Sequence, residues 1–203
     1  MDTTIRSATA DGAEAPELLV RNIRVGSRIW AASQAFFFIA FLFAFFYLRA
    51  LNSNGLWRGW PHTHKPHPSL AFGVAILICV LASAAVARSA VVLALAPAMW
   101  RLAAIGSLLL ALSAVGLQAA QFSSLGFGPT DGGYASVFVG WTGIFALVLL
   151  GTVYWLATVV ADTGRRGHAI PELHAAAVEA VSFVLVILAG VELAAFILLY
   201  TVA

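Results

Sequence analysis

Charged residues and cysteine are scarce in this 203-residue chain. Only 10% of its residues are Asp, Glu, Lys or Arg, whereas an average soluble protein has about 25%, and 62% are hydrophobic and arranged in long blocks. The single cysteine, Cys79, excludes an intramolecular disulfide, a Cys-x-x-Cys redox motif and a cysteine cluster for zinc or iron–sulfur. The composition therefore predicts an integral membrane protein.

Recognisable catalytic motifs are also missing. The chain has no Gly-x-Ser-x-Gly, no phosphate-binding P-loop and no His-Glu-x-x-His, so we predict no enzyme activity for the chain by itself. None of its histidines falls in a long apolar segment, where ligands for haem, copper or a di-iron centre would be needed. We therefore predict that this chain alone binds no redox cofactor. The net charge of +2 gives no indication of nucleic-acid binding.

Five apolar segments are long enough to cross a bilayer, whose hydrocarbon core of about 30 Å takes about 20 helical residues. They cover residues 27–48, 69–87, 102–122, 134–160 and 175–201. Residues 1–25 are polar and mixed, lack the apolar core of a signal peptide, and are predicted to form an N-terminal arm. We therefore predict an all-α fold, with residues 26–203 forming a single five-helix transmembrane bundle.

Basic residues are distributed unevenly over the two ends of this bundle. One end has three, Arg49, Arg58 and Lys65, and the other has eight: Arg6, Arg21, Arg24, Arg28, Arg88, Arg101, Arg165 and Arg166. Because cytoplasmic loops are enriched in lysine and arginine, we predict that the N-terminus is cytoplasmic and that the C-terminus lies outside.

The loop after the first span contains three histidines, His62, His64 and His67, within six residues. Imidazoles at this spacing could hold zinc or copper, but no carboxylate or cysteine lies nearby in the sequence. The plainer interpretation is a solvated loop stiffened by proline. These residues are therefore only weak metal candidates.

Four polar side chains are predicted to lie inside the spans: Gln34, Gln118, Gln121 and Glu192. An unpaired amide in hydrocarbon costs about 2 to 7 kcal/mol, so we expect interhelical partners for them. Glu192 is either a buried carboxyl that titrates or pairs with a neighbouring subunit, or a rim residue that reaches water. A carboxyl within a span often marks a proton path, which leaves a small proton-coupled transporter as one alternative. Five helices cannot, however, form two equal inverted repeats.

Four stretches carry a resemblance to a known family. They are SQAFFFIAFLFAFFYLRA (33–50), LQAAQF (117–122), GGYASVFVGWTGIFALVLLGT (132–152) and VSFVLVILAGVELAAFILLYTV (181–202). They resemble, in order, the first-helix Ser-Glu with its aromatic run, the Gln-x-x-Glu motif, the helix with two histidines and the final helix of subunit III of the haem-copper cytochrome c oxidases. The similarity is to the five-helix bacterial form of that subunit and extends from about Arg21 to the end.

The chain departs from the family at every ionisable position within these stretches. The family has Glu where this chain has Gln34 and Gln121, His where it has Phe145, Val148 and Val186, and Asp where it has Ala189. Glu192 stands where the family often has an aromatic residue. Gln34 keeps the shape of the family's Glu without its proton, so we interpret it as an amide that clamps two helices, with a role in proton conduction as the alternative.

The resemblance implies a function. A subunit III-like protein is expected to bind no redox metal itself, to pack against a catalytic subunit that contains haem and copper, and to support assembly and sustained turnover of a respiratory oxidase. It is also expected to bind phospholipid and to lie in the bacterial inner membrane. The alternatives are an accessory subunit of a nitric oxide reductase, the proton-coupled transporter using Glu192, and a scaffold of another respiratory or photosynthetic assembly.

Overall fold

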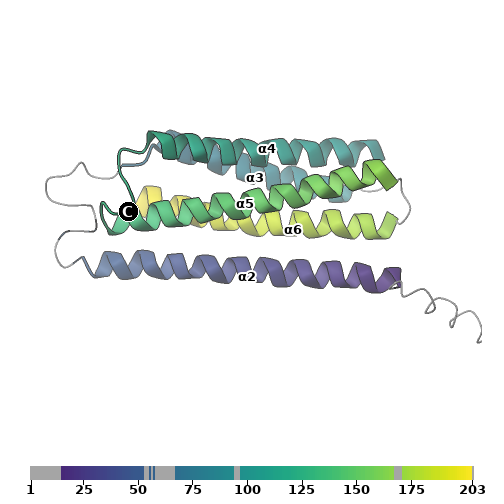
Figure 1. The fold of residues 1–203 in the computed structure, drawn as a ribbon, viewed down its shortest axis with the longest axis horizontal. Coiled ribbons are helices and arrows are strands. Elements are labelled where there is room, and N and C mark those ends of the chain that lie inside the picture. The colour runs from purple at the N-terminus through teal and green to yellow at the C-terminus, as the bar shows by residue number, and fades with distance from the viewer. Residues whose placement is uncertain are drawn as a thin grey trace, which may run out of the picture.

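A computed structural model describes residues 15–52, 55, 57, 67–93, 97–166 and 171–202. The helices are α2 (Pro16–Ala50), α3 (Leu70–Val92), α4 (Pro97–Ser124), α5 (Gly133–Arg166) and α6 (Pro171–Phe196), and α6 continues as the π-helix η2 (Ile197–Val202). They lie side by side along one axis, with the start of α2 and the C-terminus at opposite ends (Figure 1). Five helices are long and apolar enough to cross a membrane. The all-α, five-span prediction is confirmed, and no strand occurs in the described ranges.

The first helix begins earlier than the hydropathy pattern predicted. α2 starts at Pro16, so residues 16–25, which the sequence assigned to the polar arm, form its first turns. Proline is favourable in the first helical turn, and Glu17 there complements the positive end of the helix dipole. At 35 residues α2 is about 50 Å long and must extend beyond a hydrocarbon core of about 30 Å. The other helices also extend past their predicted spans, because helical hydrogen bonding continues beyond the apolar residues.

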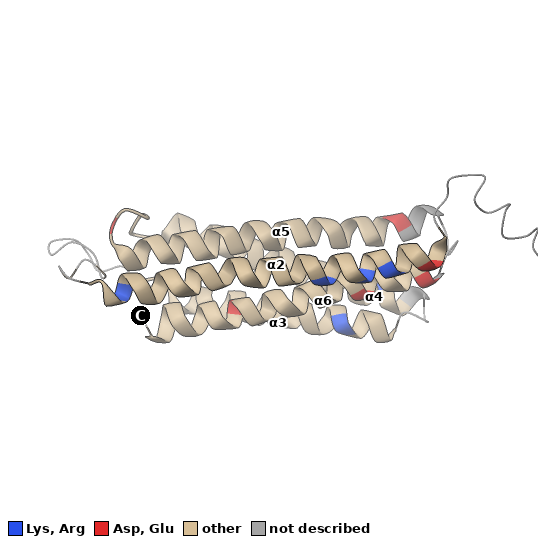
Figure 2. Cartoon of the chain, turned by 90° about the horizontal axis from the view of Figure 1, so that it is seen from below, with Lys and Arg blue, Asp and Glu red and all other residues tan. Residues whose placement is uncertain are grey.

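Three of the other four helices pack against α6. α2, α3 and α5 all pack against α6, α4 packs against α3 and α5, and α2 also contacts α5. α2 therefore lies at the edge of the bundle (Figure 1). Most of the charged residues lie toward the end of the bundle at which α2 begins (Figure 2). We call this the N-terminal end and the opposite one the C-terminal end. The predicted orientation in the membrane stays a prediction.

Aromatic packing attaches α2 to α5. Phe38 of α2 is buried against Trp141 and Phe145 of α5, with ring centroids 6.2 and 6.0 Å apart. Phe145 and Val148 stand where the resembling family has histidines, and here an edge-on aromatic contact fills that part of the interface. The α2–α5 contact is therefore apolar at this level of the bundle.

Small residues and a pair of serines hold α3 against α4. The hydroxyl of Ser83 donates to the Ser107 carbonyl and that of Ser107 donates to the Ser83 carbonyl, each over 2.9 Å. Both serines are fully buried, and alanines such as Ala84 and Ala104 lie in the same interface region of the core. Small side chains let helix backbones approach closely, which is the main source of helix association in a bilayer.

Candidate functional site

The buried amide and carboxyl side chains lie toward the C-terminal end of the bundle. Gln118 and Gln121 of α4 and Glu192 of α6 are at most 5% exposed. Tyr200 of η2 joins them. We call these four residues the polar cluster. Three of the four were predicted from the sequence, in which Glu192 falls at a depth comparable with that of Gln118 and Gln121, but Tyr200 was not.

Hydrogen bonds link three members of the cluster. The Nε2 group of Gln118 donates to Oε1 of Gln121 over 3.1 Å, and Nε2 of Gln121 donates to the Tyr200 hydroxyl over 2.7 Å. Gln121 and Tyr200 are 79 positions apart in the chain, so their bond connects α4 to η2. Gln121 therefore has the interhelical contact that the cost of burying an amide led us to expect.

Tyr200 is held by packing as well as by this bond. Its ring stacks on Phe196 and meets Phe138 of α5 edge-on, with centroids 5.2 and 5.8 Å apart. The neighbouring carbonyl of Leu199 accepts a hydrogen bond of 2.8 Å from the Tyr134 hydroxyl of α5. A π-helix shifts the usual carbonyl partners by one residue, and π-helical turns are frequent at functional sites. η2 thus positions Tyr200 between three helices.

Glu192 is near this chain of hydrogen bonds but is not part of it. Its carboxyl is close enough to the Tyr200 hydroxyl for an electrostatic interaction. Its Oε2 atom is buried and has no hydrogen-bond partner among the described residues. Of the two alternatives that the sequence left open, the buried position matches the observed 5% exposure, whereas a rim residue would be accessible.

Gln34 does not take part in the cluster. It is half-buried on α2, one turn from Phe38, and its amide forms no hydrogen bond within the described part of the chain. The expected clamp is therefore not observed at this position. The amide can remain in place because its side chain is only half-buried, so it avoids the full cost of an unpaired buried group.

The candidate metal ligands of the first loop lie mostly outside the described residues. His62 and His64 are among those not described, and His67 is exposed. Among the described residues no group of three or more His, Cys, Asp or Glu side chains is placed to hold a metal ion. Of the other histidines, His174 lies against the Trp100 ring with centroids 4.3 Å apart.

One ion pair lies toward the N-terminal end. Nε of Arg24 on α2 is 3.1 Å from Oε2 of Glu179 on α6. Both side chains are substantially exposed, so their attraction is screened by solvent and contributes little to stability. Glu179 therefore lies at the surface, where α2 and α6 meet.

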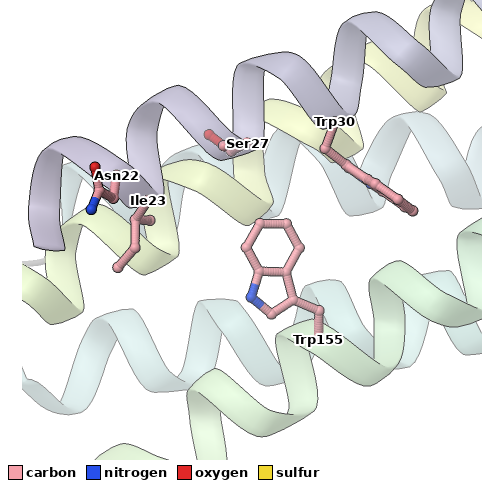
Figure 3. A pocket seen from close by; sticks show the side chains of 6 residues that line it. Asn22, Ile23, Ser27, Trp30 and Trp155 are labelled. Carbon is pink, nitrogen blue, oxygen red and sulfur yellow. The ribbon is translucent and has the colours of Figure 1, made fainter.

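A pocket of about 310 Å³ opens between α2 and α5 (Figure 3). Its lining residues are Asn22, Ile23, Gly26, Ser27, Trp30 and Trp155. The indole of Trp155 projects from α5 toward α2, and Trp30 lies further along α2 (Figure 3). Two indoles and an isoleucine make the lining largely apolar, with Asn22 as a polar group at one end. Sequence reasoning missed this pocket, because the two tryptophans are 125 positions apart and only packing brings them together.

Tyr134 and Tyr200 were also missed. Each stands at the end of an apolar segment, where tyrosine is common simply because it suits the membrane interface.

Three apolar residues stand where the resembling family has ionisable ones. Val148 is half-buried, Val186 is exposed and Ala189 is buried. No protein-family model and no curated protein matches the chain.

Proposed function

We propose that this protein is a non-redox accessory subunit, similar to subunit III, of a respiratory haem-copper terminal oxidase in a bacterial inner membrane. The sequence stretches that resemble that family supply the identity of the partner. The structural observation that best supports the proposal is the outward face of α2, which is suited to packing against a further membrane protein.

This face combines large and small side chains at regular spacing. Ile29, Phe36 and Phe43 recur every seven residues and are 63%, 77% and 68% exposed, and the exposed Ala32 and Ala40 lie between them. A seven-residue repeat keeps side chains on one side of a helix, as in coiled coils. Helices in a bilayer associate through van der Waals packing of this kind, because lipid tails are as apolar as the side chains. A catalytic subunit packed on α2 would cover the face.

The pocket between α2 and α5 supports the lipid-binding part of the proposal. An acyl chain fits its indole and isoleucine lining, and its opening at the edge of the bundle would face the bilayer. Haem and copper are assigned to the catalytic partner. The accessory subunit would contribute packing and bound phospholipid, which stabilise the assembly during turnover.

The test is purification of the tagged full-length chain in a mild detergent from its native membrane. We expect haem absorbance and a catalytic haem-copper subunit, identified by mass spectrometry, to accompany the chain in stoichiometric amount. A nitric oxide reductase subunit in the same position would establish the alternative partner. Purification of the chain alone, with no haem protein in any detergent that preserves the host oxidase, would contradict the proposal.

Paired variants locate the docking face. Replacing both Phe36 and Phe43 with alanine should reduce co-purification of the haem protein. The matched control is Leu147→Ala, which removes a 68% exposed side chain from α5 and should leave the complex intact. Equal losses in both variants would mean that α2 is not the docking face.

The buried Glu192 favours a second candidate, the proton-coupled transporter. An isolated, partner-free chain that dissipates a pH gradient across liposomes, and loses that activity in Glu192→Gln, would support it.

A further inference from the structure

We infer that Glu192 is a membrane-embedded proton-binding site, which exchanges its proton with the C-terminal end of the bundle beside Tyr200 and Gln121. The exchange is a simple dissociation. The carboxylic acid releases a proton to water at that end, leaving a carboxylate, and takes a proton back in the reverse step. This inference is independent of the partner proposed above, because it concerns groups within the chain itself.

The carboxyl group is enclosed by the protein. Glu192 is 5% exposed, and its Oε2 atom has no hydrogen-bond partner in the described ranges. An ionised carboxylate in such a place would lose its hydration without gaining a bonded partner, which is among the largest penalties in protein folding. A carboxylic acid avoids that penalty because it is uncharged. The geometry therefore favours a group that keeps its proton most of the time.

No fixed positive charge is placed to neutralise Glu192 within the described residues. The Tyr200 hydroxyl interacts with it electrostatically, and the Gln121 and Gln118 amides are linked to that hydroxyl by hydrogen bonds. Tyr134 on α5 and the half-buried Cys79 on α3 are further titratable side chains on the helices packed against α6. The arginines lie toward the helix ends and are exposed: Arg21, Arg24, Arg28 and Arg49 on α2, Arg88 on α3 and Arg101 on α4. Asp131, Asp162, Glu172 and Glu179 lie in a loop or toward the N-terminal end. Within the described ranges the Glu192 carboxyl therefore has no ion-pair partner.

Tyr200 gives the site a means of tolerating brief ionisation. Its hydroxyl oxygen already accepts a hydrogen bond from Nε2 of Gln121, so its own hydrogen remains available for donation. An electrostatic interaction joins this hydroxyl to the Glu192 carboxyl. The Tyr200 hydroxyl therefore still has its hydrogen free when the nearby carboxyl ionises.

The position of Glu192 along α6 sets the direction of exchange. It lies 10 residues before Val202 and 21 residues after Pro171, the two limits of the α6–η2 helix. At 1.5 Å per residue these separations are about 15 and about 32 Å. The C-terminal end is therefore the closer source of water. On the predicted topology this end faces the outside, so the proton exchanges with the outer medium.

A hydrophobic carbodiimide tests the site on the unmodified protein. This reagent reacts with a protonated carboxyl in an apolar setting, and the adduct is mapped by mass spectrometry. We expect an adduct on Glu192 at low pH whose yield decreases as pH rises, because the reactive acid falls about tenfold per pH unit once it titrates. A water-soluble carbodiimide should instead modify the exposed Glu172 and the partly exposed Glu179. An absence of the Glu192 adduct at every pH would overturn the inference.

Infrared spectroscopy of the purified chain distinguishes an exchanging site from an inert acid. We expect the carbonyl stretching band of a protonated carboxyl, shifted in D2O and absent in Glu192→Gln. The band should disappear as pH rises, because the acid then loses its proton. A band that persists to the highest pH without deuterium exchange would show a purely structural acid and contradict the inference. Neither experiment depends on an oxidase partner, so failure of the proposed function leaves its outcome unaffected.

Discussion

Tyr200 of η2 lies directly over Gly73 of α3. A Cβ atom added at position 73 would come within 2.6 Å of the ring atom Cζ of Tyr200, well inside the contact distance of two carbon atoms. Glycine is therefore required at this position to admit the ring. The contact lets the Tyr200 hydroxyl reach Gln121 on the far side, so a residue without a side chain in one helix determines a hydrogen bond between two others.

Gly73→Ala should displace Tyr200 and break its bond to Gln121. We expect the variant to be less stable than the wild type by about 1 to 3 kcal/mol, the usual cost of overpacking a core. Thermal unfolding in detergent, followed by circular dichroism, measures the difference. The matched control is Gly116→Ala on α4, where an added Cβ meets no atom within 4 Å, and it should leave stability unchanged or slightly higher. Equal stability of both variants would contradict the packing described here.

Gln121 and Gln34 should respond differently to replacement by leucine. Gln121→Leu removes an interhelical hydrogen bond and should cost about 0.6 to 2 kcal/mol, the range for such bonds in membranes. Gln34→Leu removes an amide with no hydrogen bond to any described residue and should cost close to nothing. The same unfolding measurement applies to both. A larger loss from Gln34→Leu would mean that Gln34 is bonded in the assembled protein.

The serine pair between α3 and α4 should act as one unit. Ser83→Ala and Ser107→Ala each remove one of the two reciprocal hydrogen bonds, and each also removes the 3.0 Å contact between the two hydroxyls. Because both single variants lose this shared contact, the double variant should cost less than their sum. A double-mutant cycle on unfolding free energies measures this coupling. Ser113→Ala is a suitable control, because the Ser113 hydroxyl donates to the Leu109 carbonyl of its own helix and has no other hydrogen bond in the described part of the chain. Strict additivity would show that the two bonds are independent.

The predicted orientation can be tested with introduced cysteines. In a Cys79→Ala background, a cysteine at Ser123 should react with a membrane-impermeant thiol reagent added outside intact cells. A cysteine at Arg101 or Arg165 should react only after the membrane is opened. Both Ser123 and Arg101 are exposed and lie at opposite ends of α4, so accessibility to solvent is matched. Labelling of position 101 from outside would reverse the assignment of the two ends.

The purified chain should show no Soret absorbance and no stoichiometric copper, because no histidine lies in a predicted span. Absorbance spectroscopy and elemental analysis measure both. Metal that is lost only when His62, His64 and His67 are replaced by alanine would establish the first loop as a site. Metal retained in that variant would contradict the prediction.

Much of the architecture follows from local properties of the sequence. A run of about 20 apolar residues can be stable across a bilayer only as a helix, so the five spans and the all-α fold can be predicted segment by segment. The cost of burying an amide or a carboxyl likewise marks Gln118, Gln121 and Glu192 as residues that need an explanation. The same argument marked Gln34, which is only half-buried and has no hydrogen-bond partner among the described residues. The sequence does not reveal how deeply a polar residue is buried.

The pairing of these residues was decided by the tertiary structure. Gln121 and Tyr200 are 79 positions apart, and their contact depends on the rotation of α4, on the π-helical turn of η2 and on the space left by Gly73. The pocket between Trp30 and Trp155 likewise depends on how far α2 stands from α5. Hydropathy determines which segments enter the membrane, but it says little about how each helix is rotated about its axis or how deeply it lies. Those are set by side-chain packing between helices, to which residues distant in the sequence contribute together.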